Sequence, residues 1–297
     1  MPKNLSKKDL KEADHWVDKT YKNLSQDEKL GQLFIVALYT NKGENEISNV
    51  RNIVVKEKIG GLILMQDDAA REINLVNEFQ QKSKVPLMIG MDAEWGLYQR
   101  IATAHKFPWA MTLGAIQDKN LIHQMSAKIA EDCHRMGINW DFAPVVDVNT
   151  NPDNPIIGNR SFGSQVSNVV SSASAYASGL QDNNILAAIK HFPGHGDTST
   201  DSHLDLPVIS HNLDRLNTVE LAPFKALMKE GIGGVMVAHL YVPALESGKG
   251  IPASVSKNII TGLLKEKLGY KGLIITDALN MNAVAGKYKP GELDAMA

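Results

Sequence analysis

The chain has a single cysteine and no long apolar run, and its positive and negative charges nearly balance. Cys133 is the only cysteine among 297 residues, which excludes an internal disulfide and a cysteine-rich metal cluster. No apolar segment approaches the ~18 residues of a membrane span, and no hydrophobic segment follows the charged start. With 31 basic against 33 acidic residues, the sequence offers no basic face for a nucleic acid. These absences leave a globular protein that neither spans a membrane nor binds nucleic acid.

Length and composition favour one large α/β domain. A chain of 297 residues, 43% hydrophobic and 22% charged, has the size and balance expected of a single barrel domain. The mixed charges of about residues 1–24 predict a helical extension with a solvated face. The sequence does not fix the compartment: the chain as it stands would be cytoplasmic, and periplasmic or secreted if an export signal has been removed.

Seven short apolar runs alternate with segments of helical spacing. Because the runs are continuous in Val, Ile and Leu, they predict parallel strands that are buried on both faces. The intervening segments carry helix signals: Ser25 and Glu28 form a capping-box pattern, and a helix is expected between Ser256 and Gly269. The predicted strands lie at 32–38, 60–65, 85–92, 138–148, 185–192, 233–240 and 272–279.

The repeated strand–helix order fits either a (β/α) barrel or an open doubly wound sheet, and periodicity alone does not choose between them. The segment YTNKGENE after the first predicted strand lacks the glycine fingerprint of a Rossmann sheet. A closed barrel requires an eighth strand and helix, and the sequence ends at GELDAMA without them. Either one strand escapes detection, or the C-terminal part of the domain is absent from the chain.

Polar side chains follow five of the predicted strands. In barrels the reactive groups lie at the carboxyl ends of strands, so this placement indicates function. One such residue alone is as easily a cap or a turn residue, but five strands ending this way are hard to explain by capping. The residues are Asp92, Glu94, Asp147, Asn149, Lys190, His191, His239 and Asp277.

The segment KHFPGHGDTSTDSH, residues 190–203, contains three histidines and two aspartates. His191 and His195 would share one face of a helix, but Pro193 and Gly194 between them predict a loop. The first predicted strand also lacks the His-x-His pair that barrel metallohydrolases carry. We therefore expect no metal and no other cofactor, although a metallohydrolase stays open as a third possibility.

Proton transfer explains the end of this segment better. Asp201 lies two residues before His203, close enough on a turn to hold the imidazole and stabilise its charged form. Histidine is a natural general acid/base because its ordinary pKa of ~6.5 is near working pH. A surface loop with incidental polar residues is the competing interpretation.

KHFPGHGDTSTDSH, followed by LDLP, resembles the signature of glycoside hydrolase family 3, in its β-N-acetylglucosaminidase branch. Seven further segments resemble that family in the expected order: MDAEWGLYQR, NWDFAPVVDVN, GNRSFG, ELAPFKAL, VMVAH, PASVS and TDALNM. The resemblance covers about residues 25–285. It implies that residues 1–297 form a single TIM-type (β/α) barrel domain, lacking its last strand and helix through C-terminal truncation.

The resemblance also implies an activity and a set of site residues. The activity is that of a retaining exo-β-N-acetylhexosaminidase, which releases terminal GlcNAc from muropeptide-derived or chitin-derived oligosaccharides, as in peptidoglycan recycling. Asp277 matches the nucleophile that forms a covalent glycosyl-enzyme, and His203 with Asp201 matches the acid/base pair. The residues that would hold sugar hydroxyls are Asp92, Arg100, Arg160, Lys190 and His191.

The sequence departs from the family pattern at Trp95, Leu97 and Ala278. Trp95 could stack on a sugar face or belong to the core. Two alternatives to the hydrolase stay open. One is a family phosphorylase, which uses phosphate in place of water; the other is an inactive sugar-binding fragment or one module of a longer enzyme. An open barrel edge would favour a further C-terminal domain or a homo-oligomer.

Overall fold

A computed structural model describes residues 6–199, 206–289 and 291–297 and shows two compact units. Each unit combines segments that are distant in the sequence, because the chain leaves and re-enters the first unit. Unit 1 comprises Met1–Phe107, Ser126–Asp141 and Leu180–Leu186, and unit 2 comprises Pro108–Met125, Phe142–Gly179 and Ala187–Ala297.

Unit 1 contains four parallel strands whose order follows the chain. Leu62, Leu64 and Ile89 on these strands are fully buried, as expected for strands covered on both faces. The strands are β1 (Ile35–Leu38), β2 (Gly61–Leu64), β3 (Met88–Met91) and β4 (Trp140–Asp141).

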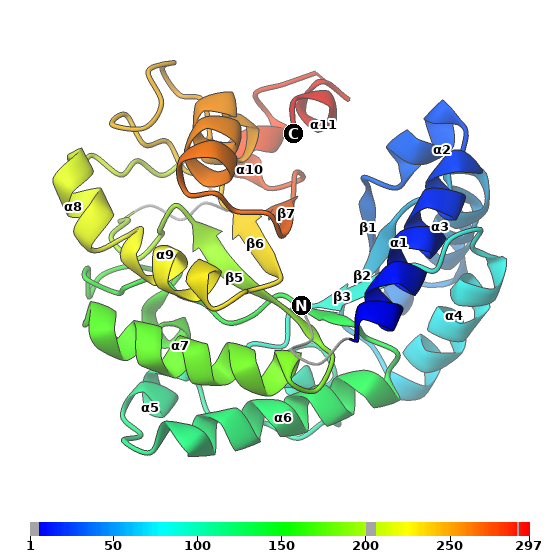
Figure 1. Ribbon diagram of the computed structural model, residues 1–297, viewed down its shortest axis with the longest axis horizontal. Helices are drawn as coiled ribbons and strands as arrows, with labels where there is room; N and C mark the ends of the chain where they lie inside the picture. The colour runs from blue at the N-terminus through cyan, green and yellow to red at the C-terminus, as the bar shows by residue number, and fades with distance from the viewer. Residues whose placement is uncertain (1–5, 200–205, 290) are drawn as a thin grey trace. The chain divides into compact units, whose positions relative to one another are not determined.

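Three helices of unit 1 begin at an N-cap side chain, Ser6, Ser25 or Asp68, that accepts a backbone hydrogen bond. Ser25 accepts a hydrogen bond from the Glu28 N–H and the Glu28 carboxylate accepts one from Ser25, which confirms the predicted capping box. Helix α3 packs against β1 and α4 (Figure 1), whereas α1 buries no residue. The helices are α1 (Lys7–Lys22), α2 (Gln26–Gly31), α3 (Glu44–Glu57) and α4 (Ala69–Lys82), and α6 (Lys119–Arg135) has its C-terminal part in this unit.

Unit 2 contains three parallel strands, again in chain order. All residues of the middle strand are buried, while Leu273 on the last strand is 48% exposed. These strands are β5 (Leu186–Phe192), whose first residue belongs to unit 1, β6 (Gly234–Val237) and β7 (Leu273–Thr276).

The helices of unit 2 surround these strands in sequence, and α8 contacts α9 directly (Figure 1). The helix expected after Ser256 is present as a π-helix, Asn258–Lys267, and Gly269 follows it with a φ of 67°. The α-helices are α5 (Ala110–Gly114), α7 (Val166–Gln181), α8 (Leu213–Thr218), α9 (Ala222–Lys229), α10 (Asn282–Ala285) and α11 (Glu292–Met296).

All seven predicted strands are confirmed, and the described residues contain no eighth strand. The prediction for 138–148 is too long, because β4 contains only Trp140 and Asp141. Pro144 has no backbone N–H to donate and interrupts regular pairing; beyond it Val145 makes an isolated bridge to Lys190. Within the described ranges, every helix is too short or too polar to cross a lipid bilayer.

Candidate active site

A buried carboxylate, Asp147, organises the histidine motif of unit 2. Its Oδ2 lies 2.7 Å from the Nδ1 of His191, whose backbone N–H also donates to the carboxylate at 3.2 Å. The backbone N–H of His195 donates to Oδ1 at 2.7 Å. Burial would raise the pKa of Asp147, but attraction to His191 and His195 and the hydrogen bonds from them lower it below its ordinary value. Asp147 is therefore held as a carboxylate.

Arg160 fixes the proton of His191. An Arg160 guanidinium nitrogen lies 3.2 Å from the Nε2 of His191, and a guanidinium can only donate. Nε2 therefore accepts, and Nδ1 carries the proton that it donates to Asp147. Lys190, one residue before, is only 2% exposed. The structure thus brings together two of the predicted sugar-binding residues, Arg160 and His191, with Lys190 beside them in the chain.

The buried surroundings of His195 favour a neutral imidazole ring. Its ring is 2% exposed, and its Nδ1 lies 2.8 Å from the hydroxyl of Thr198. Asn154 donates to the His195 carbonyl at 2.8 Å and so fixes the backbone of the loop. Burial lowers the pKa of His195 to about 4, and His191 adds to the shift, so the ring is neutral near pH 7.

Asp277 follows β7 and is partly exposed. Its backbone N–H donates to the carbonyl of Val237 on β6 at 2.8 Å, and its Oδ1 accepts the Ala278 N–H at 2.8 Å. His239 lies at the end of β6, fully buried, with its Nε2 2.9 Å from the carbonyl oxygen of Ala278. The carboxylate of Asp277 therefore lies at the end of β7, and hydrogen bonds hold the peptide groups beside it in place.

Unit 1 pairs the other two predicted sugar-binding residues. Asp92 follows β3, and the guanidinium of Arg100 donates to its carboxylate. Both side chains keep 16% of their surface exposed, so each can still reach a ligand. Trp95, between them in sequence, is partly buried. Asp92 and Arg100 belong to unit 1, whereas Lys190 and His191 belong to unit 2.

Asp201 and His203 lie outside the described residues, so their predicted role stays a prediction. The chain on either side of them is described. The Nε2 of His211 is hydrogen-bonded to the Asp197 carboxylate, and Arg215 donates to Glu220 at 3.1 Å. Asp197, His211 and Glu220 offer ligand atoms within 4.8 Å of one another, but the guanidinium beside Glu220 gives this group the character of an ion-pair network.

Several important residues were given no role from the sequence. The sequence marks Asp147 and His239 only as polar residues at strand ends, and His195 only as part of a loop. Their closeness to His191 and Asp277 depends on which strands are neighbours, and the strand-end signal could have suggested it. Glu72, a fully buried carboxyl in unit 1, carried no signal, because Glu in the first turn of a helix is ordinarily solvated.

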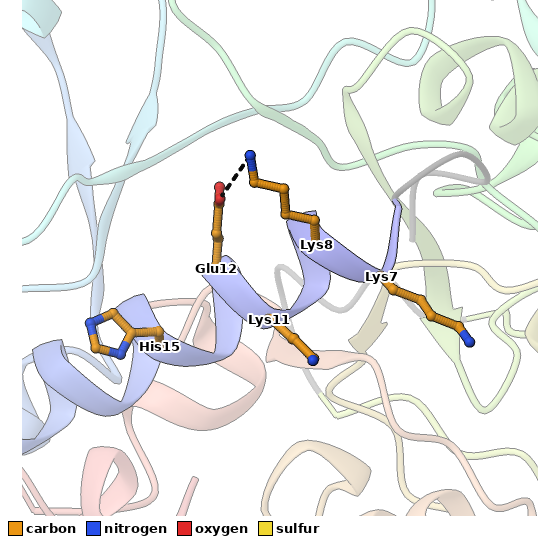
Figure 2. Close-up of a pocket in the computed structure, with 5 residues that line it drawn as sticks. All are labelled: Lys7, Lys8, Lys11, Glu12 and His15. Carbon is orange, nitrogen blue, oxygen red and sulfur yellow. Dashed lines mark ion pairs between the residues drawn. The ribbon is translucent and has the colours of Figure 1, made fainter.

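A hollow on helix α1 is unrelated to these residues. Lys7, Lys8, Lys11, Glu12 and His15 line it. Figure 2 shows Lys8 and Glu12 turned toward one another, with their charged atoms 3.7 Å apart, and Lys7 and Lys11 pointing away from them. Its described lining contains none of the predicted site residues, and such an exposed pair contributes little to stability.

The chain is similar to proteins that include glycosidases and a phosphorylase. The chain is 36% identical over 261 residues to β-hexosaminidase A of Pseudoalteromonas piscicida, covering 80% of this chain and 44% of that protein. A glycoside hydrolase family 3 β-N-acetylglucosaminidase structure from Paenibacillus sp. str. FPU-7 matches with a TM-score of 0.84 and 36% identity, covering 92% of this chain and 53% of that one. The β-glucoside phosphorylase BglX bound to 2FGlc matches with a TM-score of 0.89 and 28% identity, covering 98% and 53% of the two chains.

These likenesses confirm the TIM-type (β/α) fold predicted from the sequence, which the parallel strands in chain order also support. The chain spans about half the length of the first curated relatives that it matches. The family described as glycosyl hydrolase family 3 N terminal domain matches residues 25–297. The chain therefore belongs to glycoside hydrolase family 3 and contains that family's N-terminal domain.

Proposed function

We propose that residues 1–297 form the catalytic domain of a retaining exo-β-N-acetylhexosaminidase, with about residues 1–24 as a helical extension. The observation that carries this proposal is the histidine motif, KHFPGHGDTSTDSH, in a chain 36% identical to a β-hexosaminidase. The substrate class is an oligosaccharide with terminal, non-reducing GlcNAc, derived from muropeptides or chitin. Release of such a sugar would belong to carbohydrate metabolism such as peptidoglycan recycling.

In the proposed mechanism Asp277 attacks the anomeric carbon and forms a covalent glycosyl-enzyme. A nucleophilic carboxylate must be ionised and accessible. Asp277 is partly exposed, and its Oδ1 accepts the Ala278 N–H at 2.8 Å, which orients the carboxylate. The second carboxylate oxygen stays available for the reaction.

His203, assisted by Asp201, would protonate the leaving oxygen and then activate water. Imidazole has an ordinary pKa close to neutrality, and a neighbouring carboxylate favours the cationic form that donates the proton. This pair takes the place of the second carboxylate that most retaining glycosidases use.

Charged side chains are proposed to hold sugar hydroxyls, and those of each unit are considered by themselves. Arg160 and His191 share a proton network with Asp147, so their donor and acceptor atoms have fixed directions. The buried ammonium of Lys190 and the Asp92–Arg100 pair offer further charge-assisted hydrogen bonds. Groups of fixed orientation bind and orient a substrate with little loss of entropy.

A phosphorylase is the second candidate function, because the chain matches the β-glucoside phosphorylase BglX with a TM-score of 0.89. A neutral or cationic histidine in the acid/base position does not repel an anionic nucleophile as a glutamate would. Phosphate could then attack the glycosyl-enzyme in place of water and release a sugar 1-phosphate.

The test is hydrolysis of 4-nitrophenyl β-GlcNAc by the 297-residue chain, beside the matching β-glucoside, with and without phosphate. Hydrolysis confined to the GlcNAc substrate is expected. Asp277→Ala is expected to lower kcat at least 10³-fold while the protein stays folded. Full activity in Asp277→Ala would refute the mechanism, phosphate-dependent sugar 1-phosphate would establish the phosphorylase, and a folded but inactive chain would point to a sugar-binding module.

A further inference from the structure

Two motifs that the proposed mechanism leaves without a role meet the motif of the nucleophile at one buried histidine of unit 2. His239 belongs to VMVAH, Ser254 to PASVS, and Ala278 to TDALNM. The His239 Nδ1 lies 2.7 Å from the Ser254 hydroxyl, and its Nε2 lies 2.9 Å from the carbonyl oxygen of Ala278. His239 and Ser254 are both fully buried. The three residues form a continuous chain of hydrogen bonds that ends beside Asp277.

The direction of these hydrogen bonds follows from the chemistry of the partners. A carbonyl oxygen only accepts, so the Nε2 of His239 carries a proton and donates to Ala278. In the neutral ring Nδ1 then accepts the proton of the Ser254 hydroxyl. Burial lowers the pKa of His239, while Asp277 and the Ala278 carbonyl oppose this shift in part. The ring is therefore neutral near pH 7, with its proton on the nitrogen that faces Ala278.

Ala278 is held on both of its backbone polar groups. Its N–H donates to the Asp277 Oδ1 at 2.8 Å, and its carbonyl accepts from His239. The backbone of Asp277, one residue earlier, is also held, because its N–H donates to the carbonyl of Val237 at 2.8 Å. The carbonyl and the N–H of Ala278 belong to successive peptide planes that meet at its Cα. The hydrogen bond from His239 fixes the second plane and so restrains the Ala278 Cα, on which the placement of the first plane and its N–H depends. The direction of the Asp277 carboxylate depends on that N–H in turn.

We propose that His239 is a positioning residue for the nucleophile Asp277, with Ser254 orienting its ring. The inference rests on the proposed function, because it assigns the direction of a nucleophile. His239 touches no reacting atom; it acts through the Ala278 peptide. Attack on an anomeric carbon requires the carboxylate oxygen to be placed within a fraction of an ångström, and a displacement of about 1 Å can lower a rate on the order of 10²-fold.

Two matched substitutions separate the two ring nitrogens. The side-chain amide of Gln reaches the place of Nε2, so His239→Gln keeps a donor for Ala278. The amide of Asn reaches only the place of Nδ1, so His239→Asn keeps a partner for Ser254 and loses Ala278. Using 4-nitrophenyl β-GlcNAc as substrate, we expect His239→Asn to lower kcat on the order of 10- to 100-fold with KM changed less than about threefold. We expect His239→Gln to recover most of that loss.

A purely structural role would give a different result. Asn and Gln would then lower the melting temperature together and leave kcat per folded molecule alike in the two variants, which would overturn the inference. If His239→Asn does not fold, Ser254→Ala serves as the second variant, since it removes one hydroxyl and keeps the imidazole. It is expected to lower kcat several-fold at nearly constant KM, and an unchanged kcat would also overturn the inference.

Asp277→Ala distinguishes failure of this inference from failure of the proposed function. If Asp277→Ala is fully active, Asp277 is not the nucleophile and the proposed function falls. If Asp277→Ala is inactive while His239→Asn matches the unchanged protein, the proposed function stands and the positioning role falls. In an Asp277→Ala background, His239→Asn is expected to have no further effect, because the two residues act as one unit.

Discussion

Two carboxylic acids, Asp147 in unit 2 and Glu72 in unit 1, are equally buried but are treated in opposite ways. Each is fully buried. Asp147 accepts hydrogen bonds from the ring and backbone of His191 and from the backbone of His195. Within the described residues neither carboxylate oxygen of Glu72 has a hydrogen-bond partner. Burial disfavours the ionised form of both carboxyl groups. Within the described residues only Asp147 has hydrogen-bond donors that offset this penalty.

The pKa values of the two groups diverge accordingly. Burial tends to raise both, but attraction and hydrogen bonds from His191 and His195 bring the pKa of Asp147 below its ordinary value. Burial raises the pKa of Glu72 to about 8; the charges of Asp67 and Asp68 add to the shift, and Arg100 opposes it. A buried carboxyl is thus held ionised only where several donors converge on it, and Asp147 is such a position.

The largest effect is expected from removing Asp147. Asp147→Ala leaves the His191 ring N–H and two backbone N–H groups buried without an acceptor. We expect the free energy of unfolding to fall by about 4 kcal/mol at pH 7, measured by urea denaturation. Asp153→Ala, at an exposed position in the same connection, is the matched control and should change stability by less than about 0.5 kcal/mol. Equal stability of the two variants would contradict the importance of the donors.

A somewhat smaller effect is expected at Gly196, which lies in the same histidine loop. A Cβ atom at this position would come within 1.9 Å of the backbone oxygen of Val148, so Gly196→Ala must move backbone that carries the Asp147 contacts. We expect a loss of roughly 3 kcal/mol, read from the urea midpoint. Gly262→Ala is the control, since a Cβ there meets nothing within 4 Å, and a helical glycine replaced by alanine should stabilise slightly. If Gly196→Ala leaves the free energy of unfolding unchanged, the backbone of this loop can move at little cost, which would contradict the prediction.

The strands and the strand-end residues could be predicted from the sequence because both follow from local pattern. Continuous apolar runs mark buried parallel strands, and parallel order places their carboxyl ends on one edge. That reasoning reached Lys190, His191 and Asp277. It overestimated β4, since the effect of Pro144 on pairing is decided by the neighbouring strand.

The hydrogen-bond partners could not be predicted, since they depend on three-dimensional placement of backbone groups. The contact between His239 and the Ala278 carbonyl joins residues 39 positions apart, and no spacing rule reports the direction of a carbonyl. The burial of Glu72 is likewise set by packing around α4. Its sequence position, near the helix N-terminus, instead indicates an exposed acid that favours the helix dipole.

An effect of opposite sign is expected at Glu72, and near pH 6 it is the smallest of the three. In the unfolded chain Glu72 loses its proton near its ordinary pKa of 4.5, whereas in the folded protein it keeps the proton until about pH 8. The unfolded state therefore binds fewer protons between these values, so the contribution of Glu72 to stability falls as the pH rises through this window. Gln has the shape of the protonated acid and cannot ionise.

Glu72→Gln should accordingly match the unchanged protein near pH 4 and be more stable by about 2 kcal/mol near pH 6, with a larger difference toward pH 8, measured by urea denaturation from pH 4 to pH 8. Glu78→Gln on the same helix is the matched control. The hydrogen bonds and charges of Arg51 and Lys82 lower the pKa of Glu78 to about 2, so its stabilisation is present above pH 4.5 and lost as the pH falls. Its substitution should therefore destabilise at pH 8. If both variants shift stability in the same direction at pH 8, Glu72 does not carry a buried proton, and the contrast with Asp147 reduces to a difference in packing.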